Sequence, residues 1–272
     1  MEPKNARIVC CINQKGGVAK STTAEALADG LTLRGYRTLL IDLDPQGSVS
    51  MTSGADPSGP TAYEVVTKQC TAQEATQQRE YDVTQYDAQK VRRADIIPAS
   101  NQLAGVDIEL TGVGKEHRLK EQLKPLLAKY SYIVIDTPPA LGLLTVNALT
   151  ATNLVIVPCQ ADVYSMLGIT QLADTIEAVR EYTNPDLSLA GVLLTRHNSR
   201  SVLSRDMAEA ANMTADKIGT FLYKTVIREA VAIKEAQANC QSIYEYAPRS
   251  NAALDYEAFV DEFLLRGAKS SV

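Results

Sequence analysis

Short runs of apolar residues alternate along the chain with longer segments in which apolar positions recur every three or four residues. A short apolar run predicts a buried β-strand, and the three-to-four spacing predicts a helix with one buried face. The predicted strands cover residues 8–12, 38–41, 94–98, 132–135, 154–158, 189–195 and 221–223. This alternation predicts an α/β fold, a doubly wound, mainly parallel sheet with helices on both faces.

The predicted helices differ in how clearly their ends are marked. The helix after the first strand buries residues spaced three and four apart, and Gly35 is expected to stop it. A charged amphipathic helix is predicted over residues 115–129, where Pro125 is expected to disturb it. Further helices are predicted over residues 166–182, 202–217, 229–238 and 252–266, the last burying Tyr256, Phe259, Val260 and Phe263.

A glycine-rich turn, Gln14 to Thr22 (QKGGVAKST), joins the first predicted strand to the first helix. Strand, turn and a Lys-Ser pair at a helix start form the layout of a phosphate cradle, because the turn N–H groups and the helix N-terminus attract anions. Lys20 is expected to reach the outer phosphates and the Ser21 hydroxyl to hold magnesium. The turn departs from the pattern G-x-x-x-x-G-K-[ST], since Gln14 and Ala19 replace the two glycines.

Acidic residues follow two of the predicted strands. Asp42 and Asp44 come after the strand at 38–41, and Asp136 comes after the strand at 132–135. In an open parallel sheet, the carboxyl ends of the strands border the ligand crevice. A lone Asp beside a proline often only begins a turn. Together with the phosphate cradle, however, these three acids favour magnesium or water handling.

Composition narrows the class of protein. The chain of 272 residues, with 45% hydrophobic and 22% charged residues, predicts one large soluble domain over residues 1–272, with two small domains as the alternative. No apolar run could cross a membrane and no secretion signal is seen, so a cytoplasmic protein is expected. The net charge of -5 argues against a generally basic nucleic-acid binder. Five scattered cysteines without a C-x-x-C pair argue against a disulfide framework or metal cluster.

With these motifs in place, the chain resembles the ParA/Soj family of partition ATPases along nearly its whole length. Four motifs carry the resemblance, in the family's order and spacing: NQKGGVAKST, DLDPQG, PASNQLAG and IDTPPALGLLTVNAL. The early Lys15 marks the deviant Walker A class, which also includes MinD and the nitrogenase iron proteins. The resemblance implies a P-loop NTPase fold, ATP and magnesium as cofactors, and a weak intrinsic ATPase. Because few residues precede Lys15, no N-terminal helix-turn-helix domain is expected.

The resemblance also assigns the site residues. Two protomers would enclose two ATP molecules, and Lys15 would reach the partner's nucleotide as an arginine finger does. Asp44 would activate the attacking water, and the other catalytic residues would be Lys15 and Lys20. Magnesium would be held by Ser21, Asp42 and Asp136. The nucleotide-binding residues would be Gly16, Gly17, Val18, Ala19, Lys20, Ser21, Thr22 and Arg228, the last replacing a family proline near the adenine. A positive φ at Ala19 would put ATP binding in doubt.

DNA binding without sequence preference is implied for the ATP-bound homodimer, with hydrolysis stimulated by a ParB-like partner and a nucleoid-associated location. Residues 196–234 hold seven Lys or Arg and four acids, which suffices for phosphate contacts. Arg200 matches a DNA-contact arginine of the family. Ala232 stands at a second such position, with Lys234 as its substitute. Without the resemblance, a solvated basic face would be the preferred interpretation.

Three alternatives differ in class. A MinD-like membrane regulator needs a basic amphipathic helix at its C-terminus, whereas the last predicted helix is mainly acidic, so no membrane partner is expected. A reductase or metallocluster carrier needs paired cysteines. A binding module without hydrolysis stays open, although Lys20, Asp44 and Asp136 are all present.

Overall fold

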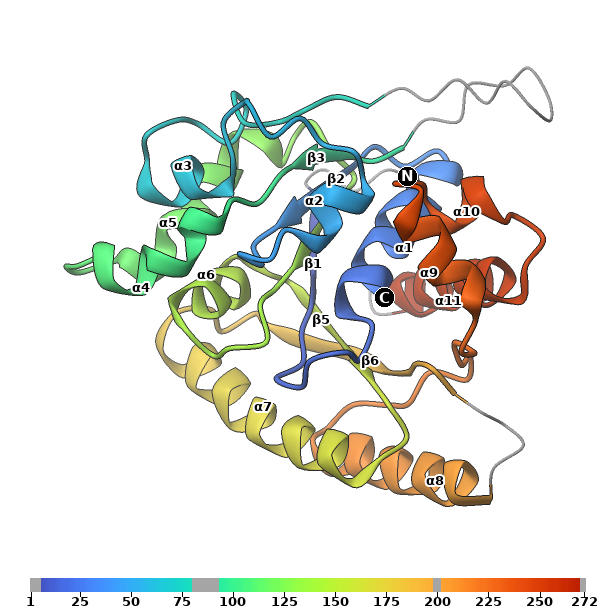
Figure 1. Cartoon of the computed structure of the whole chain (residues 1–272). Coiled ribbons are helices and arrows are strands. Elements are labelled where there is room, and N and C mark those ends of the chain that lie inside the picture. Colours follow the sequence, from blue (N-terminus) through green and yellow to red (C-terminus); the bar gives the residue numbers. More distant parts are fainter. Residues whose placement is uncertain (1–5, 80–92, 198–201, 270–272) are drawn as a thin grey trace.

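A six-stranded, all-parallel sheet organises the chain in the computed structural model, which describes residues 6–79, 93–197 and 202–269. The strand order is β3-β2-β4-β1-β5-β6 (Figure 1). The strands are β1 (Arg7–Cys11), β2 (Thr38–Asp42), β3 (Asp95–Ile97), β4 (Tyr132–Asp136), β5 (Leu154–Cys159) and β6 (Ser188–Leu194). The predicted parallel α/β architecture is confirmed.

Helices cover both faces of this sheet (Figure 1). The core on one face lies under α3 (Ala62–Thr67), α5 (Arg118–Leu123), α6 (Leu143–Ala151), α7 (Val163–Tyr182) and α8 (Val202–Lys217). The core on the other face lies under α1 (Lys20–Leu33), α9 (Val231–Ala238), α10 (Ile243–Tyr246) and α11 (Asn251–Lys269). The short helices α2 (Ser48–Thr52) and α4 (Val106–Glu109) complete the set in the described residues.

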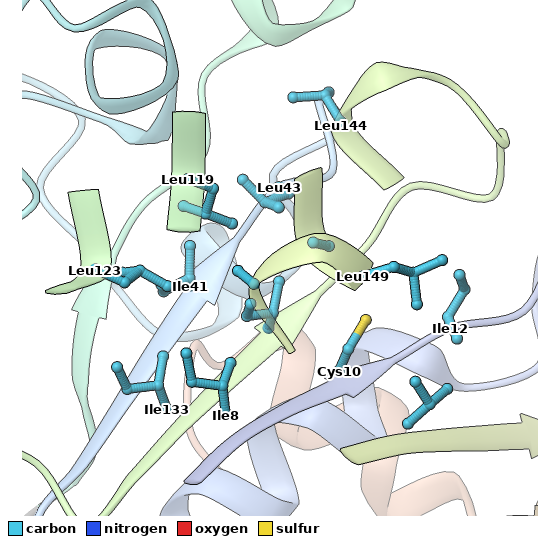
Figure 2. Packing of buried hydrophobic residues seen from close by; sticks show 14 of the residues in the cluster. Ile8, Cys10, Ile12, Ile41, Leu43, Leu119, Leu123, Ile133, Leu144 and Leu149 are labelled. Carbon is cyan, nitrogen blue, oxygen red and sulfur yellow. The ribbon is translucent and has the colours of Figure 1, made fainter. Parts of the chain in front are cut away.

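Strand alternation explains why both faces are apolar. Successive side chains of a strand point to opposite faces, so a strand buried on both sides is apolar throughout. In β1, Ile8 and Cys10 pack with one core, shown in Figure 2, whereas Val9 and Cys11 pack with the other. The predicted buried face of α11 is likewise confirmed, because its four expected side chains are at most 3% exposed.

Register brings the acidic strand ends together. Asp42, the last residue of β2, pairs in register with Asp136, the last residue of β4. Asp136 also lies opposite Cys11 at the end of β1, immediately before the glycine-rich turn. The carboxyl edge of the central strands therefore carries two acids beside the loop that leads into α1.

Two predicted elements are wrong in detail. Residues 115–129 form no continuous helix: α5 is flanked by 3₁₀ turns at Lys115–His117 and Lys124–Leu126, the second containing Pro125. Residues 221–223 form no strand, because Leu222 makes only an isolated bridge to Val192. The rings beside Leu222 pack over Gly191, whose φ is +120° and where a Cβ would lie 2.6 Å from the Tyr223 ring.

Other predicted boundaries agree with the structure. Helix α1 ends at Leu33, and Gly35 follows with φ of +84°, a left-handed turn that stops the helix. No helix in the described part of the chain is both long and apolar enough to cross a membrane.

Candidate nucleotide-binding site

The glycine-rich turn between β1 and α1 is anchored to the ends of β5 and β6. The Asn13 amide donates to the Pro158 carbonyl (2.8 Å) and accepts from the Lys15 backbone N–H (2.9 Å). The Thr195 hydroxyl lies 2.9 Å from the Val18 carbonyl, to which it donates. These side chains shape the turn before any ligand binds, which is the preorganisation an anion cradle needs.

The centre of the turn is open. Gly17 has φ of +75°, and a Cβ built on Gly16 or Gly17 would meet nothing within 4 Å. The Gly17 carbonyl accepts hydrogen bonds from the Gln160 amide (3.0 Å) and the Arg196 guanidinium (3.3 Å). These hydrogen bonds fix the Gly17 carbonyl, while the space beside Gly16 and Gly17 stays open.

Ala19 has the positive φ that the sequence analysis considered. It is the N-cap of α1, with φ of 61° and ψ of 34°, in the left-handed region. For a residue with a Cβ, this conformation costs about 1–2 kcal/mol. The methyl group thus strains the start of α1 at a position where the standard phosphate-loop pattern has glycine.

Lys20 is nearly buried inside the turn, at 7% exposure. Its ammonium group lies 3.4 Å from the Lys15 carbonyl, to which it donates. Burial lowers the pKa of Lys20, while the nearby Asp136 and Asp44 carboxyls oppose this shift. A phosphate group in the cradle would add a negative charge and favour the charged lysine further.

Asp136, the last residue of β4, is a fully buried carboxyl group. Among the described residues, neither of its oxygens has a hydrogen-bond partner that meets normal geometry. Burial raises the pKa of Asp136 well above its usual range and Asp42 adds to this, whereas Ser21 and Lys20 oppose it. An orphaned buried carboxylate beside a serine hydroxyl fits magnesium, which is usually held by one or two carboxylates plus phosphate oxygens.

Asp42 is engaged with its own chain. One of its oxygens accepts from the Asp44 N–H (3.0 Å), and the other accepts from the N–H (2.9 Å) and hydroxyl (2.7 Å) of Ser50. Burial raises the pKa of Asp42 to about 6, although these hydrogen bonds act to lower it. Asp42 thereby fixes Asp44 and α2. Asp44, at 9% exposure, accepts from the Gln46 N–H (3.0 Å).

Lys15 forms an ion pair with Asp162 of the same chain. Asp162 also caps α7 by accepting from the Ser165 N–H (2.9 Å). Although burial opposes it, hydrogen bonds from Lys15 and Ser165 lower the pKa of Asp162. The structure therefore holds the Lys15 side chain against the segment that follows β5.

The residues expected to bind adenine or DNA are spread along the chain. Arg228 is held by Asp255 on α11, with nitrogen–oxygen distances of 2.6 and 2.9 Å. Arg196 pairs with Glu229 at 2.8 Å. Lys234 is exposed on α9, and Arg200 lies outside the described residues. Two cations of the basic segment are therefore already neutralised by neighbouring acids.

Sequence patterns missed Asp162, Gln160 and Asp255 as members of the site. Gln160 and Asp162 follow β5, so the rule that singled out Asp42 and Asp136 could have found them. Asp255 lies on a helix 27 residues beyond Arg228, and no local pattern signals that pairing.

A phosphate loop of this shape, with buried acids at the neighbouring strand ends, defines the class of P-loop nucleoside triphosphatases. The family model described as AAA domain matches residues 6–189. The sporulation initiation inhibitor protein Soj of Bacillus subtilis is 37% identical over 96% of this chain and 99% of its own length. The chromosome partitioning protein ParA of Myxococcus xanthus is 35% identical over 97% and 90%. The chain belongs to the ParA/Soj family of partition ATPases.

Solved structures agree with this fold. A Mycobacterium smegmatis structure titled cobyrinic acid a,c-diamide synthase with bound ADP and magnesium matches with a TM-score of 0.80 and 34% identity, over 98% of this chain and 97% of that one. A MinD structure from Pyrococcus horikoshii, complexed with Mg-ADP, matches with a TM-score of 0.74 at 23% identity, over 94% and 95%. The second likeness shows a shared fold.

Proposed function

We propose that the protein is an ATP-dependent DNA partition ATPase whose ATP-bound dimer binds DNA without sequence preference. The observation that carries this proposal is that Lys15, the additional lysine at the start of the loop, is held by a partly exposed ion pair. A catalytic lysine in that place would serve a site shared by two protomers. The Mycobacterium smegmatis relative, solved with an ATP analogue and magnesium at 34% identity, supports the choice of cofactors.

The geometry supports a role for each site residue within one protomer. Lys20 would neutralise the outer phosphates, and Ser21 and Asp136 would hold magnesium, which polarises the phosphates when bound. Asp42 would act mainly through the Asp44 backbone that it fixes. Asp44 would orient and deprotonate the attacking water, a role that typically contributes about 10²–10⁴-fold. The N–H groups of Gly16 to Ser21 would cradle the phosphates.

Lys15 would change partner when two protomers meet. Its side chain and that of Asp162 are each about one-third exposed (31% and 32%), and ion pairs at such exposure contribute only about 0–1 kcal/mol. A triphosphate offered by the second protomer carries more negative charge than one carboxylate. Lys15 would therefore leave Asp162 and complete the partner's site, in the manner of an arginine finger.

DNA contacts are proposed for Lys234 and Arg200, on a narrower patch than composition suggests, because acids neutralise Arg196 and Arg228. A ParB-like protein would stimulate hydrolysis and release the dimer from the nucleoid. A MinD-like membrane role is less well supported, because charged side chains of α11 contact the rest of the protein. Glu262 accepts from the Thr225 N–H (2.9 Å), and the Arg266 guanidinium stacks 3.9 Å from the Phe221 ring centroid.

A DNA-binding series tests this function. Binding to random-sequence duplexes is measured with ADP, ATP and a nonhydrolysable analogue at several salt concentrations, with anionic vesicles in parallel. We expect binding only with ATP or the analogue, with equal affinity for different sequences and a linear loss of log affinity with log salt. Binding to vesicles instead of DNA would favour the membrane role, and binding to neither would reject partition.

A further inference from the structure

Helix α9 is joined to the start of α1 by a side-chain hydrogen bond. The Gln237 amide nitrogen donates to the Thr22 hydroxyl oxygen at 3.2 Å. Both residues line a small pocket between the two helices, together with Glu25, Ile233 and Gln241. Gln237 is half-buried in this pocket, whereas Lys234, one turn earlier on α9, is exposed. One helix thus contacts the phosphate loop and carries a cation on its surface.

The direction of this hydrogen bond has a chemical consequence. A threonine hydroxyl can accept from one group while donating its own proton to another. Because Gln237 donates to the Thr22 oxygen, the hydroxyl proton is free to point elsewhere. Thr22 belongs to the segment that is proposed to bind nucleotide. A hydroxyl held in this way is set to donate to a phosphate oxygen.

A second contact joins the other end of α9 to the same loop. The Arg196 guanidinium bonds both the Gly17 carbonyl (3.3 Å) and the Glu229 carboxylate (2.8 Å). Glu229 immediately precedes Ala230, the N-cap of α9. Arg196 has φ of 50°, a left-handed conformation that residues with a Cβ seldom adopt and that clusters at functional positions. The two contacts therefore link both ends of α9 to the phosphate loop.

We propose that Gln237 is a positioning residue that orients the Thr22 hydroxyl toward bound nucleotide and couples the nucleotide site to α9. This inference rests on the proposed function, since it takes Thr22 as a nucleotide contact and α9 as part of the DNA-binding face. Coupling between two binding sites is reciprocal: nucleotide raises DNA affinity by the same factor by which DNA raises nucleotide affinity, so a loss of coupling at Gln237 reduces both effects equally.

The substitution Gln237→Glu tests the proposal in the full chain, because it keeps the side-chain shape but leaves only acceptor atoms. Thr22 must then donate its proton to the introduced carboxylate, and the phosphate loses that donor. Binding of a fluorescent ATP analogue is measured for wild type, Gln237→Glu, Gln237→Ala and Gln241→Glu. The last variant places the same charge in the same pocket and is the matched control.

We expect Gln237→Glu to weaken nucleotide binding at least about fivefold, within the usual range of coupling between sites. Gln237→Ala should weaken it less, since the Thr22 proton stays available, and Gln241→Glu should change it little. In a Thr22→Val background, Gln237→Glu should have almost no further effect. A merely structural Gln237 would instead make Gln237→Ala the worse variant, with a lower unfolding temperature.

Two results would overturn the inference: wild-type nucleotide affinity in Gln237→Glu, or the same loss in Gln241→Glu. The DNA measurement is kept separate from the nucleotide measurement. If wild type binds ATP but not DNA, the partition function fails while the nucleotide series still decides the role of Gln237. If both bind, the factor by which ATP raises DNA affinity should be smaller in Gln237→Glu than in wild type, and DNA should raise ATP affinity by the same smaller factor.

Discussion

The Lys15 ammonium group pairs with the Asp162 carboxylate of its own chain, at the edge of the phosphate loop. Asp162 lies on the segment after β5, where it also caps α7. The pair holds the Lys15 side chain against the segment after β5. Any reach toward a partner's nucleotide must therefore first break this contact.

Replacing Asp162 with asparagine should favour the ATP-bound dimer. Asparagine still caps the helix N-terminus, so α7 is retained, while the intrachain competitor for Lys15 loses its charge. Each exposed ion pair contributes about 0–1 kcal/mol, and dimerisation breaks one in each protomer, so the dimer dissociation constant should fall by up to about 30-fold. Sedimentation with a nonhydrolysable ATP analogue measures this constant. A weaker dimer would show that the Lys15–Asp162 contact serves dimerisation directly.

Replacing Ala19 with glycine should stabilise the protein. Glycine removes the strain of about 1–2 kcal/mol at φ of 61°, and loses part of that gain through the greater freedom of the unfolded chain, about 0.4–1 kcal/mol. Urea unfolding should give a net gain of about 0 to 1.6 kcal/mol, with nucleotide affinity kept or improved. Ala24→Gly, inside the same helix, should instead lose about 1 kcal/mol. A loss in both variants would contradict a strained loop.

Replacing Asp44 with alanine should separate binding from hydrolysis. Asp44 is nearly buried beside the cradle and is fixed by Asp42, as a water-orienting base requires. Turnover should fall about 10²-fold or more, while nucleotide affinity changes little and the DNA-bound state persists. Steady-state phosphate release and equilibrium nucleotide binding measure the two effects. Turnover close to that of wild type would remove the proposed role of Asp44.

Glu25 should make stability fall as the pH rises. Burial raises the pKa of Glu25 to about 7, although the Arg93 guanidinium opposes the shift. The folded protein holds this proton more tightly than the unfolded chain, in which the pKa of Glu is about 4.3. The stabilisation from the bound proton is therefore complete below about pH 4. It is lost as the pH rises through about 7. Glu25→Gln cannot lose a proton, so it should gain relative to wild type between about pH 5 and pH 8.

Urea unfolding at the two pH values measures this difference. The same substitution at the exposed Glu235 controls for the change in net charge. A difference between wild type and Glu25→Gln that does not change with pH would show that Glu25 is ionised in the folded protein throughout this range.

The parts of the site that could be predicted are those fixed by local spacing and strand ends. The phosphate loop lies between one strand and one helix, and Asp42 and Asp136 end adjacent parallel strands, so one rule places them together. The pairing of Arg228 with Asp255 depends on how α11 docks, which no local pattern contains. The left-handed φ at Ala19 runs against the residue's own preference, so only the loop's anchors reveal it.

The most direct test of a shared, two-protomer site mixes two inactive variants, Lys15→Ala and Asp44→Ala. If Lys15 serves the partner's nucleotide, a mixed dimer has one intact site, formed by Asp44 of one protomer and Lys15 of the other. A 1:1 mixture should then recover about one quarter of wild-type ATPase activity, because half the dimers are mixed and each has one working site. No recovery, with mixed dimers present, would contradict the shared site.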